Sequence, residues 1–408
     1  MKNKLLLISL CILFFTGCED KKPDQREFPI IRTLTPTHVD ASGATFCGEL
    51  IQEGNTQTTS FGFIWSDVEP DINESNKIIL GEVITSGTFE IRIDSAFVKG
   101  VEYKIKAFAT YSDKTVYGNT ISIFSKGCSK SSWSLELRRF PLKVINCSSY
   151  GNADNEYGYI SFADSRNFIY DPVKNEISGT VKFPIETHSL YTSVIINKIQ
   201  YFFTYLNTNL YKLENGAWSV QSIIPFNYGN FNGYYLGFAV SGKLYILSSY
   251  RSYMYDPDTD IWQSKAILSS GPGASSGGTV LNNKAYIITG GKAIWEYDIN
   301  TDSWVYKTSF PGNIVSSGLV VSFSYNDKIY FGLSYTRFSD NLHSLSNMDR
   351  RLWSYDPVSN KWNILEGFPV TLSTGGLFYF FLKDNLYVGY HDMAGICDIW
   401  KFDPSLNN

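Results

Sequence analysis

A tyrosine followed seven residues later by a tryptophan recurs through the second half of the chain, and this repeat constrains the fold most strongly. The four pairs are Tyr211/Trp218, Tyr255/Trp262, Tyr297/Trp304 and Tyr355/Trp362. A fifth copy begins at Tyr170 but has Ile177 in the tryptophan position. The copies begin at residues 170, 211, 255, 297 and 355, so they are spaced by 41, 44, 42 and 58 residues. Such a period in β-rich sequence is typical of a propeller in which each repeat forms one four-stranded blade.

A second mark lies upstream in each repeat. A turn residue or pair is followed by alternating apolar and aromatic residues, in the segments Asn197–Tyr201, Gly242–Tyr245, Asn283–Tyr286, Asp327–Tyr330 and Asp384–Tyr387. This pattern predicts a tight hairpin turn that leads into a strand. Each blade therefore has strand a, a turn, strand b, strand c with the tyrosine, a polar turn, and strand d with the tryptophan.

These marks resemble the kelch repeat, in which a Gly-Gly pair closes strand b and a Tyr and a Trp follow on the next two strands. Gly290-Gly291 is the one complete pair, and Ser248-Ser249 and Gly332-Leu333 occupy the equivalent places in two other repeats. The resemblance covers roughly residues 128 to 408. It implies a propeller fold, whereas function is not implied because propellers of this kind serve many roles.

The two ends of the repeat region indicate how the ring closes. The chain ends in a strand c at Trp400–Phe402 with no strand d after it, and Ser132–Pro141 resembles a strand d with no partner before it. We therefore expect Trp133 to complete the last blade, which removes two open sheet edges and gives six blades. The alternative is a seven-bladed ring with a missing element.

Residues 1–17 have the features of an export signal. Lys2 and Lys4 precede an apolar run that is too short for a transmembrane helix, and small residues lead to Cys18. This arrangement resembles the bacterial lipobox and implies lipidation at Cys18, with residues 18–27 as a tether. The alternative is an ordinary secretory signal with a chance cysteine. The lipobox implies attachment to the bacterial outer membrane through lipid alone, with no transmembrane helix. Residues 19–22 of the tether resemble tags that direct some bacterial lipoproteins to the outer face, which implies cell-surface display.

Residues 28–126 contain short strands without the propeller marks. About 100 residues with Trp65 inside a strand and Tyr103 opening a late strand fit an immunoglobulin-like sandwich. The spacing of Phe97 and Tyr103 resembles the tyrosine corner of fibronectin type III domains. Cys47 is expected to point into the sandwich core. The predicted fold class is thus all-β, with a fibronectin-III-like sandwich (28–126) before a six-bladed kelch-like propeller (127–408), and the sandwich is interpreted as a spacer.

Charge and spacing exclude several function classes. Removal of residues 1–17 takes away two lysines and moves the net charge from −4 to −6, so nucleic acid is not an expected partner. The four histidines lie in separate segments without metal-ligand spacing, so no metal or other cofactor and no catalytic set is predicted. A disulfide of Cys128 with Cys147 or Cys397 stays open.

The candidate ligand-binding residues lie in loops of one propeller face. The interval between Tyr330 and Tyr355 is 25 residues, against 10 or 11 in its siblings, and repeat insertions often form the binding face. The candidates are Tyr228, Phe231, Tyr335, Arg337, Phe338, Asp340, His343, Arg350, Tyr390 and His391. Aromatic and polar side chains of this kind suit a carbohydrate or a protein partner. The alternatives are surface loops without a function, and a sugar-modifying enzyme that resembles mutarotase-like propellers.

Overall fold

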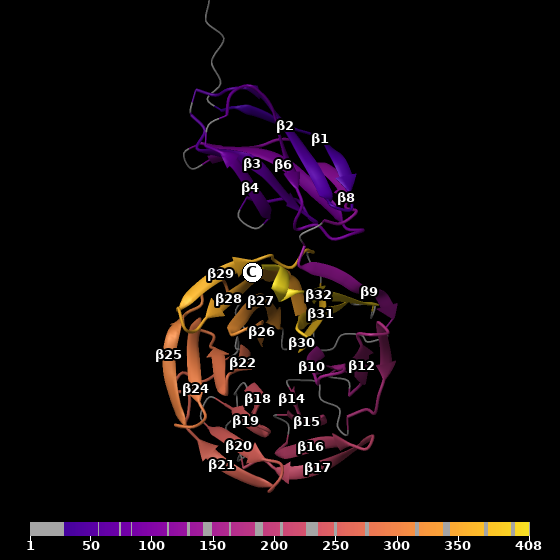
Figure 1. Ribbon diagram of the computed structural model, residues 1–408, viewed down its shortest axis with the longest axis vertical. Helices are drawn as coiled ribbons and strands as arrows, with labels where there is room; N and C mark the ends of the chain where they lie inside the picture. Colours follow the sequence, from indigo (N-terminus) through magenta and orange to yellow (C-terminus); the bar gives the residue numbers. More distant parts are fainter. Residues whose placement is uncertain are drawn as a thin grey trace, which may run out of the picture.

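The protein is all-β in the computed structural model. The structure describes residues 28–407 except 56, 73–74, 83, 112–113, 129–130, 142–148, 163–164, 184–190, 205–206, 226–235, 249–250, 274–276, 315–317, 338–342, 371–373 and 393–395. Over these residues it has 32 strands and one short 3-10 helix at Pro404–Asn407. Figure 1 shows a sandwich of strands standing on the rim of a ring of sheets. Among the described residues, no helix has the length and apolarity to cross a membrane.

The sandwich consists of two antiparallel sheets. One has the order β1-β2-β5, and the other has the order β4-β3-β6-β7 with β8 also paired to β6. The strands are β1 (Ile30–Asp40), β2 (Gly43–Gln52), β3 (Ser60–Ser66), β4 (Asn76–Gly81), β5 (Gly87–Ile93), β6 (Glu102–Tyr111), β7 (Lys114–Tyr117) and β8 (Ile121–Phe124). Rings of Phe46, Phe63, Trp65 and Phe97 pack edge to face or tilted between the sheets, so aromatic burial supplies most of the core.

Tyr103 is fully buried, and its hydroxyl accepts a hydrogen bond from the Val98 backbone N–H at 3.2 Å. This bond fixes the corner between β5 and β6. Burial raises the pKa of the Tyr103 hydroxyl, so it stays protonated. The prediction for Cys47 was wrong: Phe46 points into the core, whereas Cys47 is half-buried on the opposite face, because neighbouring residues of a strand alternate between faces.

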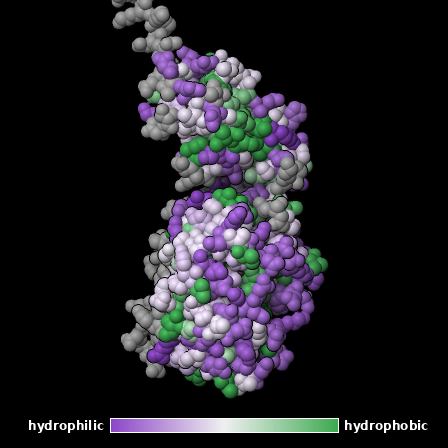
Figure 2. Space-filling view, turned by 60° about the vertical axis from the view of Figure 1, so that its left-hand side comes forward, coloured by the Kyte–Doolittle hydropathy of each residue, from purple (hydrophilic) through white to green (hydrophobic). Residues whose placement is uncertain are grey.

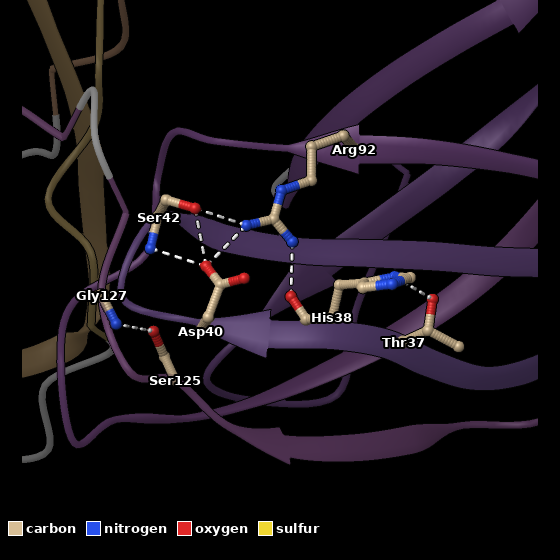
Figure 3. A network of polar contacts seen from close by, with 7 residues as sticks. All are labelled: Thr37, His38, Asp40, Ser42, Arg92, Ser125 and Gly127. Carbon is tan, nitrogen blue, oxygen red and sulfur yellow. Dashed lines mark hydrogen bonds and ion pairs between the residues drawn. The ribbon is translucent and has the colours of Figure 1, made fainter.

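Arg92 on β5 braces the hairpin between β1 and β2 (Figure 3). Its guanidinium donates to Asp40 Oδ1 and Ser42 Oγ, each at 2.7 Å, and to the His38 carbonyl. Hydrogen bonds from Ser42 and Arg92 lower the pKa of Asp40 to about 2. The hairpin tip is therefore held by an ionised carboxylate over the physiological pH range.

Four sheets of the ring have four antiparallel strands each, and each sheet follows chain order. The first two contain β10 (Ser149–Ala153), β11 (Gly158–Phe162), β12 (Asn167–Asp171), β13 (Glu176–Gly179), β14 (Tyr191–Ile196), β15 (Ile199–Thr204), β16 (Asn209–Glu214) and β17 (Ala217–Ile223). The next two contain β18 (Leu236–Val240), β19 (Lys243–Leu247), β20 (Ser252–Asp256), β21 (Ile261–Lys265), β22 (Gly277–Leu281), β23 (Lys284–Ile288), β24 (Ala293–Asp298) and β25 (Ser303–Ser309). Sheets of this kind are typical of propeller blades.

The remaining ring strands form one eight-stranded sheet that divides into two groups of four. One group is β26 (Gly318–Tyr325), β27 (Lys328–Arg337), β28 (His343–Asp356) and β29 (Lys361–Leu365). The other is β30 (Thr374–Leu382), β31 (Asn385–Asp392), β32 (Ile396–Phe402) and β9 (Trp133–Pro141). Strand β9 pairs antiparallel with β32, and Trp133 lies opposite Phe402. A strand from before the repeats thus completes the last group of four, as the sequence predicted.

The recurring tyrosine and its polar turn hold each blade together internally. In four blades the tyrosine hydroxyl donates to the side chain of an Asn or Asp five residues later, at 2.6–2.9 Å; the pairs are Tyr170/Asn175, Tyr255/Asp260, Tyr297/Asp302 and Tyr355/Asn360. Each of these acceptors has a φ between 49° and 56°, a conformation that Asn and Asp tolerate better than most residues. The motif is therefore structural.

The recurring tryptophan joins neighbouring blades. The Trp304 indole lies 4.8 Å from the Tyr297 ring, and its N–H donates to the carbonyl of Ala266 in the preceding connector. Trp133 makes the equivalent contact, because its indole N–H donates to the Glu366 carbonyl at 3.1 Å. Ala266 and Glu366 each stand two residues before a buried apolar residue, Leu268 or Phe368. Trp133 therefore occupies the same structural position as the tryptophans of the intact repeats.

Candidate binding face of the ring

The insertion predicted between Tyr330 and Tyr355 forms a β-ribbon. Strands β27 and β28 extend beyond the length of their counterparts in the other sheets, and Arg337 pairs with His343 near the end of the ribbon. Register shifts interrupt the pairing on both sides of Ser334, so the ribbon departs from the regular ladder there. The extra residues of this repeat thus continue its two middle strands rather than form a separate domain.

The ribbon crosses to the innermost strand of the next group. His343 pairs with Gly375 and Ser344 with Thr374, at the start of β30. Gly375 in turn pairs with Asp392 at the end of β31. Figure 1 shows β30 on the inner side of its group, so this pairing brings the described end of the ribbon backbone to an inner strand of the ring.

The backbones of Tyr335, Arg337 and His343 therefore lie in this ribbon. Tyr228, Phe231, Phe338 and Asp340 lie outside the described residues, and so does Cys18.

Two candidates on β31 are less accessible than the sequence suggested. Tyr390 is half-buried and packs at the edge of an apolar cluster. His391 is only 1% exposed, its ring lies 5.3 Å from that of Phe162, and a Cβ added at Gly376 would overlap its imidazole. The sequence predicted a surface loop here, but β31 continues through Asp392 and turns His391 into the space between two blades. The expected loop position of His391 was therefore wrong, because the residue lies on a strand and is buried.

Arg350 does not belong to this face. Its guanidinium donates to Asp67 Oδ1 at 2.9 Å and to Ser66 Oγ at 3.2 Å, and both partners belong to the sandwich. The Arg350 and Asp67 side chains are 19% and 11% exposed, so the ion pair is largely removed from water. The structure thus places Arg350 at the contact between ring and sandwich, apart from the far end of the ribbon.

The innermost strands of the ring contain no Asp, Glu, Lys, Arg or His over their described extents. They carry uncharged polar residues instead. Asn152 on β10 donates to Ser193 Oγ on β14, and Gln200 donates to the same oxygen at 3.3 Å. Asn167 connects Gln200 to Ser161 through bonds of 3.2 and 2.9 Å. Sequence reasoning missed this chain of amides and hydroxyls, although isolated Asn and Ser residues in otherwise apolar strands were a visible signal.

The buried charge cluster in the ring is internally paired. Glu296 on β24 accepts from Lys284 at 2.5 Å and from the Tyr286 hydroxyl at 2.7 Å, and Lys307 lies at 3.3 Å. Burial raises the pKa of Glu296, but the hydrogen bonds from Lys284 and Tyr286 outweigh it and the net shift is downward. A carboxylate that is ionised and already bound by Lys284, Tyr286 and Lys307 is poorly suited to proton transfer at neutral pH. Among the described residues, no group of three or more His, Cys, Asp or Glu side chains could hold a metal ion.

Cys128 and Cys397 lie in different parts of the molecule. Cys128 donates to the Phe97 carbonyl at 3.2 Å in the sandwich, whereas Cys397 is buried in the ring. They are therefore not bonded to each other. Cys147 lies outside the described residues.

Comparison with known proteins supports the fold. No protein-family model and no curated protein matches the sequence. The structure is similar to a solved structure titled "Structure of YjhT", with a TM-score of 0.50 and 14% sequence identity. The match covers 63% of this chain and 94% of that chain. At this identity the likeness shows the fold alone.

Proposed function

We propose that the protein is a non-catalytic binding protein that is anchored to the outer membrane by lipid at Cys18 and displayed at the cell surface. In this proposal a fibronectin-III-like sandwich carries a six-bladed kelch-like propeller. The ligand is a carbohydrate or a partner protein, bound at the ribbon face of the ring. The observation that carries the proposal is the pairing of the ribbon with β30, which brings an elaborated segment to an inner strand of the ring.

The inner strands favour binding over catalysis. Hydrolysis or isomerisation of a sugar by acid–base chemistry needs positioned groups that exchange protons near neutral pH, and carboxylates or histidines usually supply them. The inner strands offer amides and hydroxyls, which suit hydrogen bonds to a neutral, hydroxyl-rich ligand. The sugar-modifying enzyme remains the second candidate, since the Asn152–Ser193 contact places hydrogen-bonding groups on two innermost strands.

A glycan array probed with residues 19–408 as a soluble protein tests the proposal. We expect binding to a defined glycan class, and we expect the triple variant Tyr228→Ala, Tyr335→Ala, Phe338→Ala to weaken it by at least about tenfold, as for aromatic hot spots. Tyr306→Ala is the matched control, because Tyr306 is an exposed aromatic residue on the outer strand β25.

Three results would count against parts of the proposal. Unchanged binding by the triple variant would refute the ribbon face as the site. Absence of glycan binding would leave the protein partner, to be sought by cross-linking at the cell surface. Turnover of a bound sugar would refute the non-catalytic binding protein and support the sugar-modifying enzyme.

A further inference from the structure

The sandwich and the ring meet at a polar and apolar junction on the rim of the ring, beside β29, β32 and β9 (Figure 1). Figure 2 shows from a second direction that the two parts meet end to end, along the long axis of the molecule. The ion pair of Arg350 with Asp67 is one of the contacts across this junction.

Glu366, in the connector that follows β29, is the second centre of the junction. Its carboxylate accepts from Ser131 Oγ at 2.9 Å and from the Ser132 N–H at 2.6 Å. The backbone N–H of Ala96, in the β5–β6 corner of the sandwich, also hydrogen-bonds to it. One side chain of the ring thus holds both the sandwich and the segment that enters the closing strand β9.

Apolar packing follows the same path. Val98 from the sandwich corner is 3% exposed and belongs to one cluster with Trp133, Phe368 and Trp400 of the ring. The β1–β2 hairpin also lies against the connecting segment, since a Cβ added at Gly127 would be 3.4 Å from the Ala41 carbonyl oxygen. Figure 3 shows Gly127 beside this hairpin. The sandwich core, the connecting segment and the ring core are therefore continuous.

We propose that the sandwich is a clasp for the ring. It is not an independent spacer: through Arg350 and Glu366 it holds β9 in place on β32 and makes sandwich and ring one rigid unit. An ion pair that is largely removed from water is costly to break from one side, because the remaining partner is left as an uncompensated charge. The Arg350 carbonyl accepts a hydrogen bond from the Phe368 N–H at 2.8 Å, and the Phe368 ring packs on Trp133. Loss of the Arg350–Asp67 pair therefore disturbs the packing around Trp133, and with it the closing strand.

The clasp also fixes how the ring is presented. The sandwich contacts the rim and covers neither mouth of the ring, so the axis of the ring lies across the long axis of the molecule (Figures 1 and 2). A ligand can then approach the ribbon face along the axis of the ring, without passing the sandwich.

The clasp is tested in residues 19–408 by exchanging the charges of Arg350 and Asp67 and measuring the hydrogen exchange of backbone amides. Arg350→Asp and Asp67→Arg each place like charges at the junction. In each variant we expect the backbone amides of β9 to exchange at least about tenfold faster. This factor corresponds to only a small part of the free energy lost when one partner of a buried ion pair is removed. The amides of β20, on a distant sheet, should keep their protection. The double variant Arg350→Asp, Asp67→Arg should restore β9, because the pair is re-formed in reverse.

The matched control is Arg251→Ala, which removes an exposed arginine of the ring that is away from the junction. It should leave β9 unchanged. Unaltered exchange of β9 in both single variants would overturn the clasp. It would equally be overturned if β20 lost protection to the same extent as β9, or if the double variant failed to restore β9, since the pair would then not act on ring closure specifically.

Discussion

Replacement of Trp133 by alanine should destabilise the ring at least as severely as replacement of a tryptophan inside an intact repeat. The Trp133 side chain is 3% exposed, and its ring centroid lies 5.0 Å from those of both Phe368 and Phe402. Removal of a buried tryptophan costs about 3–5 kcal/mol through lost burial and the cavity left behind. The Glu366 carbonyl also loses its donor, which adds to the cost when the group cannot reach water.

The measurement is urea unfolding of residues 19–408, followed by circular dichroism. With an m-value of about 3 kcal/mol/M, a loss of about 4 kcal/mol lowers the midpoint by roughly 1.3 M. Trp304→Ala is the matched variant, because Trp304 makes the same indole-to-carbonyl contact in the β22–β25 sheet. Val358→Ala, at a side chain that is 93% exposed, should leave the midpoint unchanged.

The comparison between the two tryptophan variants tests whether β9 holds the ring closed. If β9 is a full member of the last group of four strands, Trp133→Ala lowers the midpoint at least as much as Trp304→Ala, because Trp133 is buried and Trp304 is half-buried. A normal midpoint for Trp133→Ala, beside a large loss for Trp304→Ala, would show that the ring is held closed without the strand before the repeats.

Three further predictions concern single side chains. Tyr255→Phe removes the hydrogen bond to Asp260 and should lower the free energy of unfolding by about 0.5–1.5 kcal/mol; unchanged stability would show that the motif serves another purpose. Burial raises the pKa of the Glu366 carboxyl above its usual 4.5. Between the unfolded and the folded pKa, the folded protein keeps a proton that the unfolded chain has released. The stability that goes with this proton is present at low pH and is lost as the pH rises through the folded pKa. From pH 7 to pH 4 the wild type should therefore gain stability relative to Glu366→Gln, and a difference that is constant across this range would contradict the buried carboxylate. Cys18→Ala should release the protein from membrane fractions into the soluble fraction with its circular dichroism unchanged, whereas retention in the membrane would exclude the lipid anchor.

Much of the blade structure could be predicted because its causes are local. The tyrosine hydroxyl bonds to a residue only five positions away, and the turn between them needs a residue that tolerates positive φ. Both requirements leave marks at fixed spacing. The hairpin turns are equally local: Asn282 and Asn283 both have positive φ, as a two-residue type I′ turn requires, and Asn is among the residues that favour it.

The site could be predicted only in part because its contacts are long-range. Arg350 and Asp67 lie 283 positions apart, and nothing in the neighbourhood of either residue indicates the other. His391 was placed in a loop because its segment follows a recognisable strand b, whereas the strand continues past it. Cys47 shows the same weakness on a smaller scale, since a shift of one residue reverses the face of every side chain in a strand.

The division between repeated and unrepeated residues explains where function is to be sought in such a chain. The recurring tyrosine, its Asp or Asn partner and the tryptophan are all used inside or between blades, so none of them is available to a ligand. Residues available for function must then lie where one repeat differs from its siblings. The β27–β28 repeat differs most: one end of its insertion pairs with β30, an inner strand of the ring, and Arg350, further along β28, pairs with the sandwich. The same unrepeated strand thus carries both the proposed binding face and the contact that orients it.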